Sequence, residues 1–168
     1  MTRSPIERLR NTLLRRGTVL SSPPPGLGNF MTPEQRELAR RVRPFAEAMY
    51  LVIGADAEVG PRERDVLRGA LRTLTDNLLS SAALDRMLAE FQEARASEGL
   101  EPRLDAVASA LYGDRTDAEL ALELAIAAAS VDGRLDAREQ MVAQTLGERL
   151  GIAPAHVDRL MHDTPPVE

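Results

Sequence analysis

The sequence contains no cysteine and no tryptophan, and although 43% of its residues are hydrophobic, only 3% are aromatic. Without cysteine the chain cannot form disulfides, zinc–thiolate sites, iron–sulfur clusters or a thiol nucleophile. Lysine is also missing, which excludes a phosphate-binding loop that ends in Gly-Lys. The sequence has no run of about 18 apolar residues, so it predicts neither a membrane-spanning helix nor a secretory signal and favours a cytoplasmic protein.

Charge is distributed unevenly along the 168 residues. Residues 1–30 contain five arginines and one glutamate, a net charge of +4, which leaves −9 on residues 31–168 because the whole chain carries −5. An acidic surface repels phosphate backbones, so we expect no nucleic-acid binding by residues 31–168. The size of this part is typical of one globular domain, preceded by a basic leader over residues 1–30.

The leader has the pattern of a short basic amphipathic helix over residues 4–16, with arginines on the opposite face from the apolar positions. The apolar positions are Ile6, Leu9, Leu13 and Leu14. Such a helix can bind an anionic membrane, here the inner face of the cell membrane, or a partner's groove; a mobile or packed helix is the simpler alternative. Residues 17–30 are rich in proline, glycine and serine, which predicts a linker.

Residues 31–168 predict helices throughout, because no window alternates with the period of a strand. Proline and capping residues mark the expected starts: Pro44 is expected to break the first run, Ser81 to cap a helix and Thr116 to open a capping box. The expected helices are 33–42, 44–55, 61–79, 82–96, 102–112, 117–131, 137–150 and 154–162. The predicted fold class is therefore all-α, a compact bundle of about seven to eight helices.

One segment of the chain occurs twice. Residues 56–63 (DAEVGPRE) match residues 132–139 (DGRLDARE), and each copy follows a helix of small and apolar residues and precedes another helix. The repeated unit is helix, acidic turn, helix. This repeat predicts two halves related by a pseudo-twofold axis.

The repeated turns place carboxylates in matching positions. Two hairpins related by a pseudo-twofold axis could bring Asp56, Glu63, Asp132 and Glu139 to one surface. Clustered carboxylates repel one another unless a cation lies between them, and oxygen ligands suit Ca²⁺ or Mg²⁺ better than Zn²⁺. The turn is not an EF-hand, because its glutamate comes too early to complete the calcium loop.

Helix capping explains part of this pattern without a metal. Glu63 and Glu139 fall in the first turn of a helix, where a glutamate can hydrogen-bond back to the N-cap backbone. Asp56 and Asp132 come where a helix ends, a position that the helix dipole disfavours for an acidic residue. Since the unfavourable placement recurs, the pattern favours a functional acidic site over a purely structural turn.

These doubled Ala-Asp-Gly-Glu-Val-like segments, each followed by a helix-opening glutamate, resemble the tellurite-resistance TerB family. The resemblance covers about residues 33–163. It includes relatives of the TerB family, among them the N-terminal domain of membrane-anchored DjlA co-chaperones. It assigns the acidic positions of the family to Asp56, Glu58, Glu63, Asp132 and Glu139. Ala57 stands where the family usually has glycine and Arg134 where it has an acidic residue, so the second turn has one carboxylate fewer.

The resemblance implies a non-enzymatic cytoplasmic stress-response protein that binds a divalent metal and works with membrane-bound partners of the TerC type. Clustered carboxylates repel anions, so we do not expect the turns to capture tellurite directly. Two other function classes stay open. One is a metal-free adaptor whose acidic surface recognises basic segments of a partner protein, and the other is a hydrolase in which a bound metal activates water.

Overall fold

The computed structural model describes residues 6–7, 11, 31–56 and 58–163. Within these residues it contains seven α-helices, one short 3₁₀ turn and no strand, which confirms the predicted all-α class. The elements are α2 (Pro33–Ile53), α3 (Pro61–Leu74), α4 (Ser81–Glu98), α5 (Leu100–Ala110), α6 (Arg115–Ala129), η1 (Ser130–Asp132), α7 (Ala137–Arg149) and α8 (Pro154–Asp163). The pseudo-twofold relation between the two halves stays a prediction.

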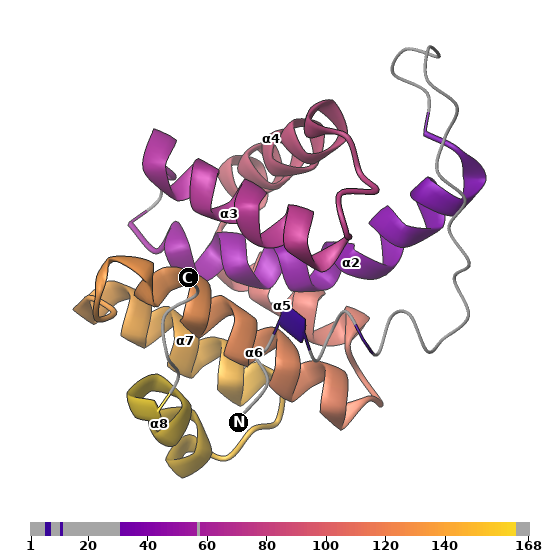
Figure 1. The fold of residues 1–168 in the computed structure, drawn as a ribbon. Helices are drawn as coiled ribbons and strands as arrows, with labels where there is room; N and C mark the ends of the chain where they lie inside the picture. The colour runs from indigo at the N-terminus through magenta and orange to yellow at the C-terminus, as the bar shows by residue number, and fades with distance from the viewer. Residues whose placement is uncertain (1–5, 8–10, 12–30, 57, 164–168) are drawn as a thin grey trace.

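Helix α2 is the centre of the bundle (Figure 1). It contacts α6 most extensively and also packs against α3, α4, α5 and α7, while α8 packs on α7. In Figure 1, α3 and α4 lie on one side of α2, and α6 and α7 lie on the other. Every residue from Phe45 to Ile53 is buried, as expected of a helix that is covered on all sides.

The three phenylalanine and tyrosine side chains that the sequence places at apolar helical positions all lie in the core. Phe45, Tyr50 and Phe91 are each no more than 3% exposed. The rings of Tyr50 and Phe91 are 5.8 Å apart and tilted by 50°, a geometry within the favourable range for aromatic pairs. This pair joins α2 to α4.

The predicted helix break at Pro44 is wrong, because α2 runs without interruption from Pro33 to Ile53. A proline inside a helix removes one N–H donor and costs about 3 kcal/mol. The helix continues because its C-terminal half is buried all round in the core. Its N-terminus is also fixed, by a capping box in which Thr32 and Gln35 exchange side-chain to backbone hydrogen bonds.

Two predicted caps are displaced by one or two residues. Ser80, not Ser81, is the N-cap of α4, and Asp114, not Thr116, is the N-cap of α6. In both places the chain offers two residues of good capping type close together. Local preference therefore does not distinguish them, and the packing of the helix decides which one serves.

Helix α3 is shorter than predicted and ends at Leu74 rather than near residue 79. The next turn holds Asp76 and Asn77 in the left-handed region, with φ of 53° and 59°. Asn and Asp tolerate this conformation better than other non-glycine residues. The turn is tied to the start of α2, since Gln35 Nε2 donates to the carbonyl of Leu78 at 2.9 Å.

Most of the predicted basic leader lies outside the described residues. Of its apolar positions the structure describes Ile6, which is 3% exposed and belongs to the hydrophobic core. Ile6 is therefore packed against the domain, and it would have to leave the core before it could contact a lipid surface. No helix among the described residues is long and apolar enough to cross a membrane.

Candidate functional site

The first acidic turn follows α2 and is closely packed at its start. Gly54 caps the helix, and a Cβ atom at this position would lie 2.8 Å from Cγ2 of Val59. Asp56 is exposed beyond the end of α2, and its Oδ1 accepts a long 3.4 Å hydrogen bond from the Glu58 backbone N–H. Since Asp56 is outside the helix, the dipole penalty that the sequence predicts for it is reduced.

The second acidic turn follows α6 through η1. Asp132 is exposed and is the last residue of η1, while Leu135 is buried and anchors the turn to the core. Gly133 has φ of 126° and ψ of −96°, a backbone conformation that residues with a side chain rarely adopt. Ala57, the corresponding residue of the first turn, lies outside the described residues.

Both glutamates of the repeated segment cap the helix that they open, as the capping interpretation predicts. Glu63 Oε2 accepts a hydrogen bond from the Gly60 N–H at 2.5 Å, and Glu139 Oε2 accepts one from the Asp136 N–H at 2.8 Å. Asp136 returns the interaction through Oδ1, which accepts from the Glu139 N–H at 2.8 Å. Each glutamate therefore has one carboxylate oxygen fixed by the backbone.

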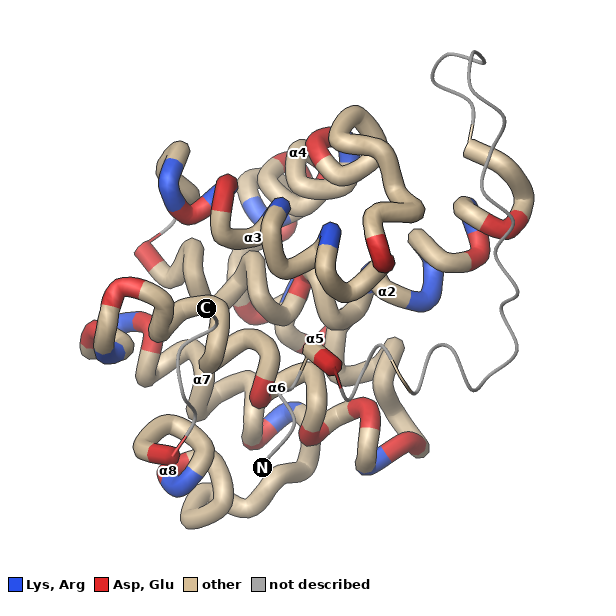
Figure 2. Tube along the Cα trace, in the orientation of Figure 1, with Lys and Arg blue, Asp and Glu red and all other residues tan. Residues whose placement is uncertain are grey.

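The structure brings carboxylates of the two turns into one electrostatic cluster, here called the acidic cluster: Asp56, Glu63, Asp136 and Glu139. Burial raises the pKa of Glu139 above its usual value of 4.5, and the hydrogen bond from the Asp136 backbone opposes this rise. The negative charges of Asp136, Glu63 and Asp56 raise this pKa further. Figure 2 shows both turns at the same end of the molecule, at the left of the view.

Two of the predicted site residues are not joined to this cluster by an observed interaction. Glu58 and Asp132 are exposed, and neither is among the groups that shift the pKa of Glu139. Arg62 and Arg138, which could have neutralised the aspartates, form no ion pair within the described residues. No ion pair therefore neutralises the acidic cluster in the described part of the chain.

The acidic cluster fits a divalent cation by chemistry but only partly by geometry. Glu63 and Glu139 each present a second carboxylate oxygen beyond the one that caps the helix, and oxygen donors are the ligands of Ca²⁺ and Mg²⁺. The part of the chain that the structure describes holds no group of three or more acidic or histidine side chains at metal-binding spacing. The turns would have to move closer to complete a coordination shell.

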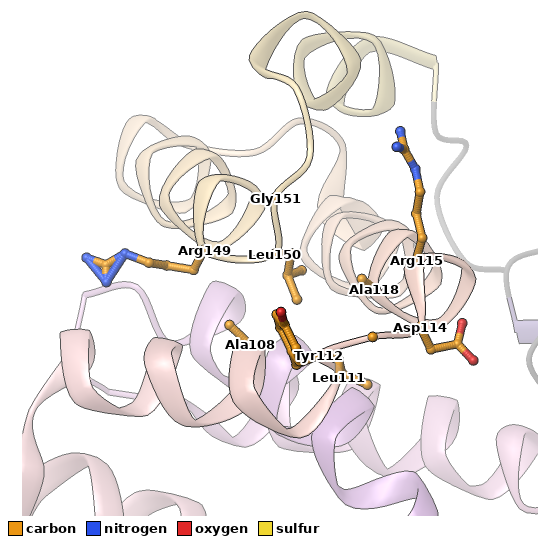
Figure 3. Close-up of a pocket in the computed structure, with 10 residues that line it drawn as sticks. Ala108, Leu111, Tyr112, Asp114, Arg115, Ala118, Arg149, Leu150 and Gly151 are labelled. Carbon is orange, nitrogen blue, oxygen red and sulfur yellow. The ribbon is translucent and has the colours of Figure 1, made fainter.

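A cavity of about 290 Å³ lies away from the acidic cluster, between the ends of α5, α6 and α7 (Figure 3). Tyr112 lines it and is 91% exposed, and Figure 3 shows its ring between Leu111 and Leu150. The side chains of Arg115 and Arg149 extend away from the cavity on opposite sides. The sequence does not predict this cavity, because three helix ends form it and no motif connects them.

Comparison of the chain with known proteins identifies a family. A family model described as "Tellurite resistance protein TerB" matches residues 45–162, more than half of the chain, and this range includes both acidic turns. No curated protein and no solved structure matches the chain.

Proposed function

The chain belongs to the TerB family of tellurite-resistance proteins, and we propose that it is a non-enzymatic stress-response protein that binds a divalent cation at its acidic cluster. Ca²⁺ and Mg²⁺ are preferred over Zn²⁺, because the cluster offers only carboxylate oxygens and the chain has no cysteine. The observation that supports this proposal is the acidic cluster itself: Glu63 and Glu139 each present a second carboxylate oxygen beyond the one that caps a helix, and carboxylates of both turns raise the pKa of Glu139.

A bound cation would remove an unfavourable interaction. Glu139 is half-buried and is surrounded by like charges from Asp56, Glu63 and Asp136, an arrangement that disfavours its ionised form. A divalent cation between these side chains would replace the repulsion with attraction. Binding would therefore couple the end of α2 to the start of α7, since each helix is next to one of the turns.

We also propose that the protein acts with membrane-associated protein partners on the cytoplasmic side. Residues 31–168 carry a net charge of −9, which favours basic segments of a partner through complementary charge. The leader would add contact with an anionic membrane once Ile6 leaves the core.

Melting curves test the cation site directly. The full chain is unfolded by heat in chelator and then with Ca²⁺, Mg²⁺, Mn²⁺ or Zn²⁺ added singly. A ligand that binds only the folded state adds about 2.7 kcal/mol of stability at 100 times its Kd, which corresponds to several degrees in Tm. We expect a rise with Ca²⁺ or Mg²⁺ for the wild type and for Glu148→Gln, an exposed glutamate at the other end of α7.

The substitution Glu139→Gln should remove most of the rise, because glutamine keeps the hydrogen bond to the Asp136 N–H but lacks the charge. Asp56→Ala combined with Asp132→Ala tests the predicted aspartate ligands in the same assay. If no cation shifts the melting curve of the wild type, the cation proposal is wrong. In that case the metal-free adaptor is favoured, and its binding to basic partner segments should weaken with salt but not with chelator.

A further inference from the structure

A second cluster of polar side chains lies at the junction of α2, α3 and α4. Its charge is positive, in contrast to the acidic cluster. Arg64 of α3 donates from Nη2 to Gln92 Oε1 of α4 at 2.5 Å and from Nε to the Val59 carbonyl at 3.3 Å. Arg95 lies one helical turn beyond Gln92 on the same face of α4. Two guanidinium groups are therefore directed to one region.

Tyr50 of α2 completes this cluster. Its ring packs against Phe91, one turn before Arg95 on α4, and the positive charges of Arg64 and Arg95 both act on its hydroxyl. Burial raises the pKa of Tyr50, although the positive charges of Arg64 and Arg95 act in the opposite direction. The phenol consequently stays protonated at neutral pH and can donate a hydrogen bond.

One donor of this cluster has no acceptor. Nη1 of Arg95 is shielded from solvent and makes no hydrogen bond within the described residues. Native proteins rarely leave a buried donor unsatisfied, because the lost hydration is not replaced, and the loss is greatest for a charged group. Arg95 as a whole is only half-buried, so other atoms of the residue remain exposed to solvent.

The two arginines also lack the carboxylate partners that other arginines of these helices have. Arg43 forms an ion pair with Glu90 at 2.6 Å, and Arg68 forms one with Asp85 at 2.5 Å. Among the residues that the structure describes, no carboxylate is within ion-pair distance of Arg64 or Arg95. Two positive charges that both act on Tyr50 thus have no ion-pair partner in the part of the chain that the structure describes.

We propose that Arg64, Arg95 and Tyr50 form a binding site for a phosphate group, either free or as part of a small phosphomonoester. The donors come from three helices, α2, α3 and α4, and three separate donors suit a tetrahedral oxyanion with several acceptor oxygens. A planar carboxylate instead pairs best with the parallel N–H groups of a single guanidinium. The site is separate from the acidic cluster and does not depend on a cation.

The two tyrosines and the absence of tryptophan make a direct spectroscopic test possible. Tyr112→Phe leaves Tyr50 as the single phenol, and Tyr112 is exposed, so the substitution does not disturb the core. This full-length variant is titrated in chelator with inorganic phosphate, against sodium chloride at equal ionic strength. We expect a saturable change in tyrosine near-ultraviolet absorption with phosphate and none with chloride.

Arg95→Gln and Arg64→Gln, each made in the Tyr112→Phe background, should weaken phosphate binding by about tenfold or more, since each removes one charged donor. Arg68→Gln is the matched control, because it removes the same charge from α3 at a residue already paired with Asp65 and Asp85. It should leave the affinity within about twofold. Melting curves establish that each variant is folded.

Glycerol phosphate distinguishes the two sources of the phosphate group. Tighter binding of the ester than of inorganic phosphate identifies a small phosphomonoester as the ligand, and the reverse identifies free phosphate; either supports the site. Absence of a saturable phosphate effect on the parent variant overturns the proposal. So does an equal loss of affinity in Arg95→Gln and Arg68→Gln, which would show a general effect of net charge.

Discussion

The ion pair between Glu47 and Arg103 is the most buried of the ion pairs found among the described residues, and its removal tests how α5 is held to α2. The Glu47 side chain is 6% exposed and that of Arg103 is 17% exposed. Nε and Nη2 of Arg103 both lie 2.7 Å from Oε1 of Glu47. Burial opposes the charge of Arg103, but hydrogen bonds to Glu47 and Glu98 outweigh it and raise its pKa.

Replacing Arg103 with methionine keeps most of the aliphatic side chain and leaves the Glu47 carboxylate buried without its cation. Breaking a buried pair in this way typically costs about 3–5 kcal/mol. Arg103 retains some contact with solvent, so we expect a loss at the lower end, about 3 kcal/mol. For a domain of this size each kcal/mol shifts Tm by about 2–4 °C, which predicts a decrease of about 6–12 °C.

A second substitution should reverse much of this loss. The double variant Glu47→Leu with Arg103→Met should recover much of the stability at neutral pH, because no buried charge remains.

Arg149→Met is the matched control for this experiment. Arg149 also contacts two carboxylates, Glu101 at 2.6 Å and Asp105 at 2.5 Å, but both of these are more than half exposed. An exposed pair typically contributes about 0.5 kcal/mol, so the loss of both pairs should cost about 1 kcal/mol, which corresponds to about 2–4 °C. Equal losses in Arg103→Met and Arg149→Met, measured by circular dichroism, would refute the assignment of the buried pair.

Three further predictions concern separate parts of the fold. Gly147→Ala should destabilise the folded protein by about 1–3 kcal/mol, because the new Cβ would lie 2.5 Å from Val157 Cγ2 of α8. Adding Val157→Ala should restore part of this stability, measured by chemical denaturation. In chelator, Glu139→Gln should have a higher Tm than wild type at neutral pH. The pKa of Glu139 is raised in the folded state, so ionisation of this carboxyl destabilises the wild-type fold. The difference in Tm should therefore become smaller as the pH falls toward about 4.5. Pro44→Ala should stabilise the folded protein by about 1–2 kcal/mol in urea unfolding. Alanine restores the missing helical N–H, which outweighs the loss of the proline ring that restricts the unfolded chain. A lower urea midpoint than that of wild type would contradict this.

Much of the helical arrangement is predictable from local chemistry. Asp136 and Glu139 satisfy the capping rules within four residues of sequence, and the structure shows the predicted capping box with α7 starting at Ala137. Pro154 likewise opens α8 as predicted. These starts are predictable because both hydrogen-bonding partners are neighbours in the sequence.

Features that depend on distant partners were not predictable in the same way. The continuation of α2 through Pro44 depends on the contact with α6, which is far away in the sequence. The burial of Glu47 depends on Arg103, 56 positions further along the chain. The sequence signal for this pair is that Glu47, a charged residue, stands in a run of apolar residues. This signal does not identify Arg103 as its partner.

The acidic turns show that capping and clustering are compatible. From the sequence, Glu63 and Glu139 are expected to be either helix caps or parts of a functional site. In the structure each glutamate fixes one oxygen on a backbone N–H, and this hydrogen bond holds its carboxylate at the start of a helix. The same restraint keeps Glu139 within the electrostatic field of Glu63 and Asp56. Capping therefore preorganises part of the acidic cluster, and the repulsion within it is what a bound cation would relieve.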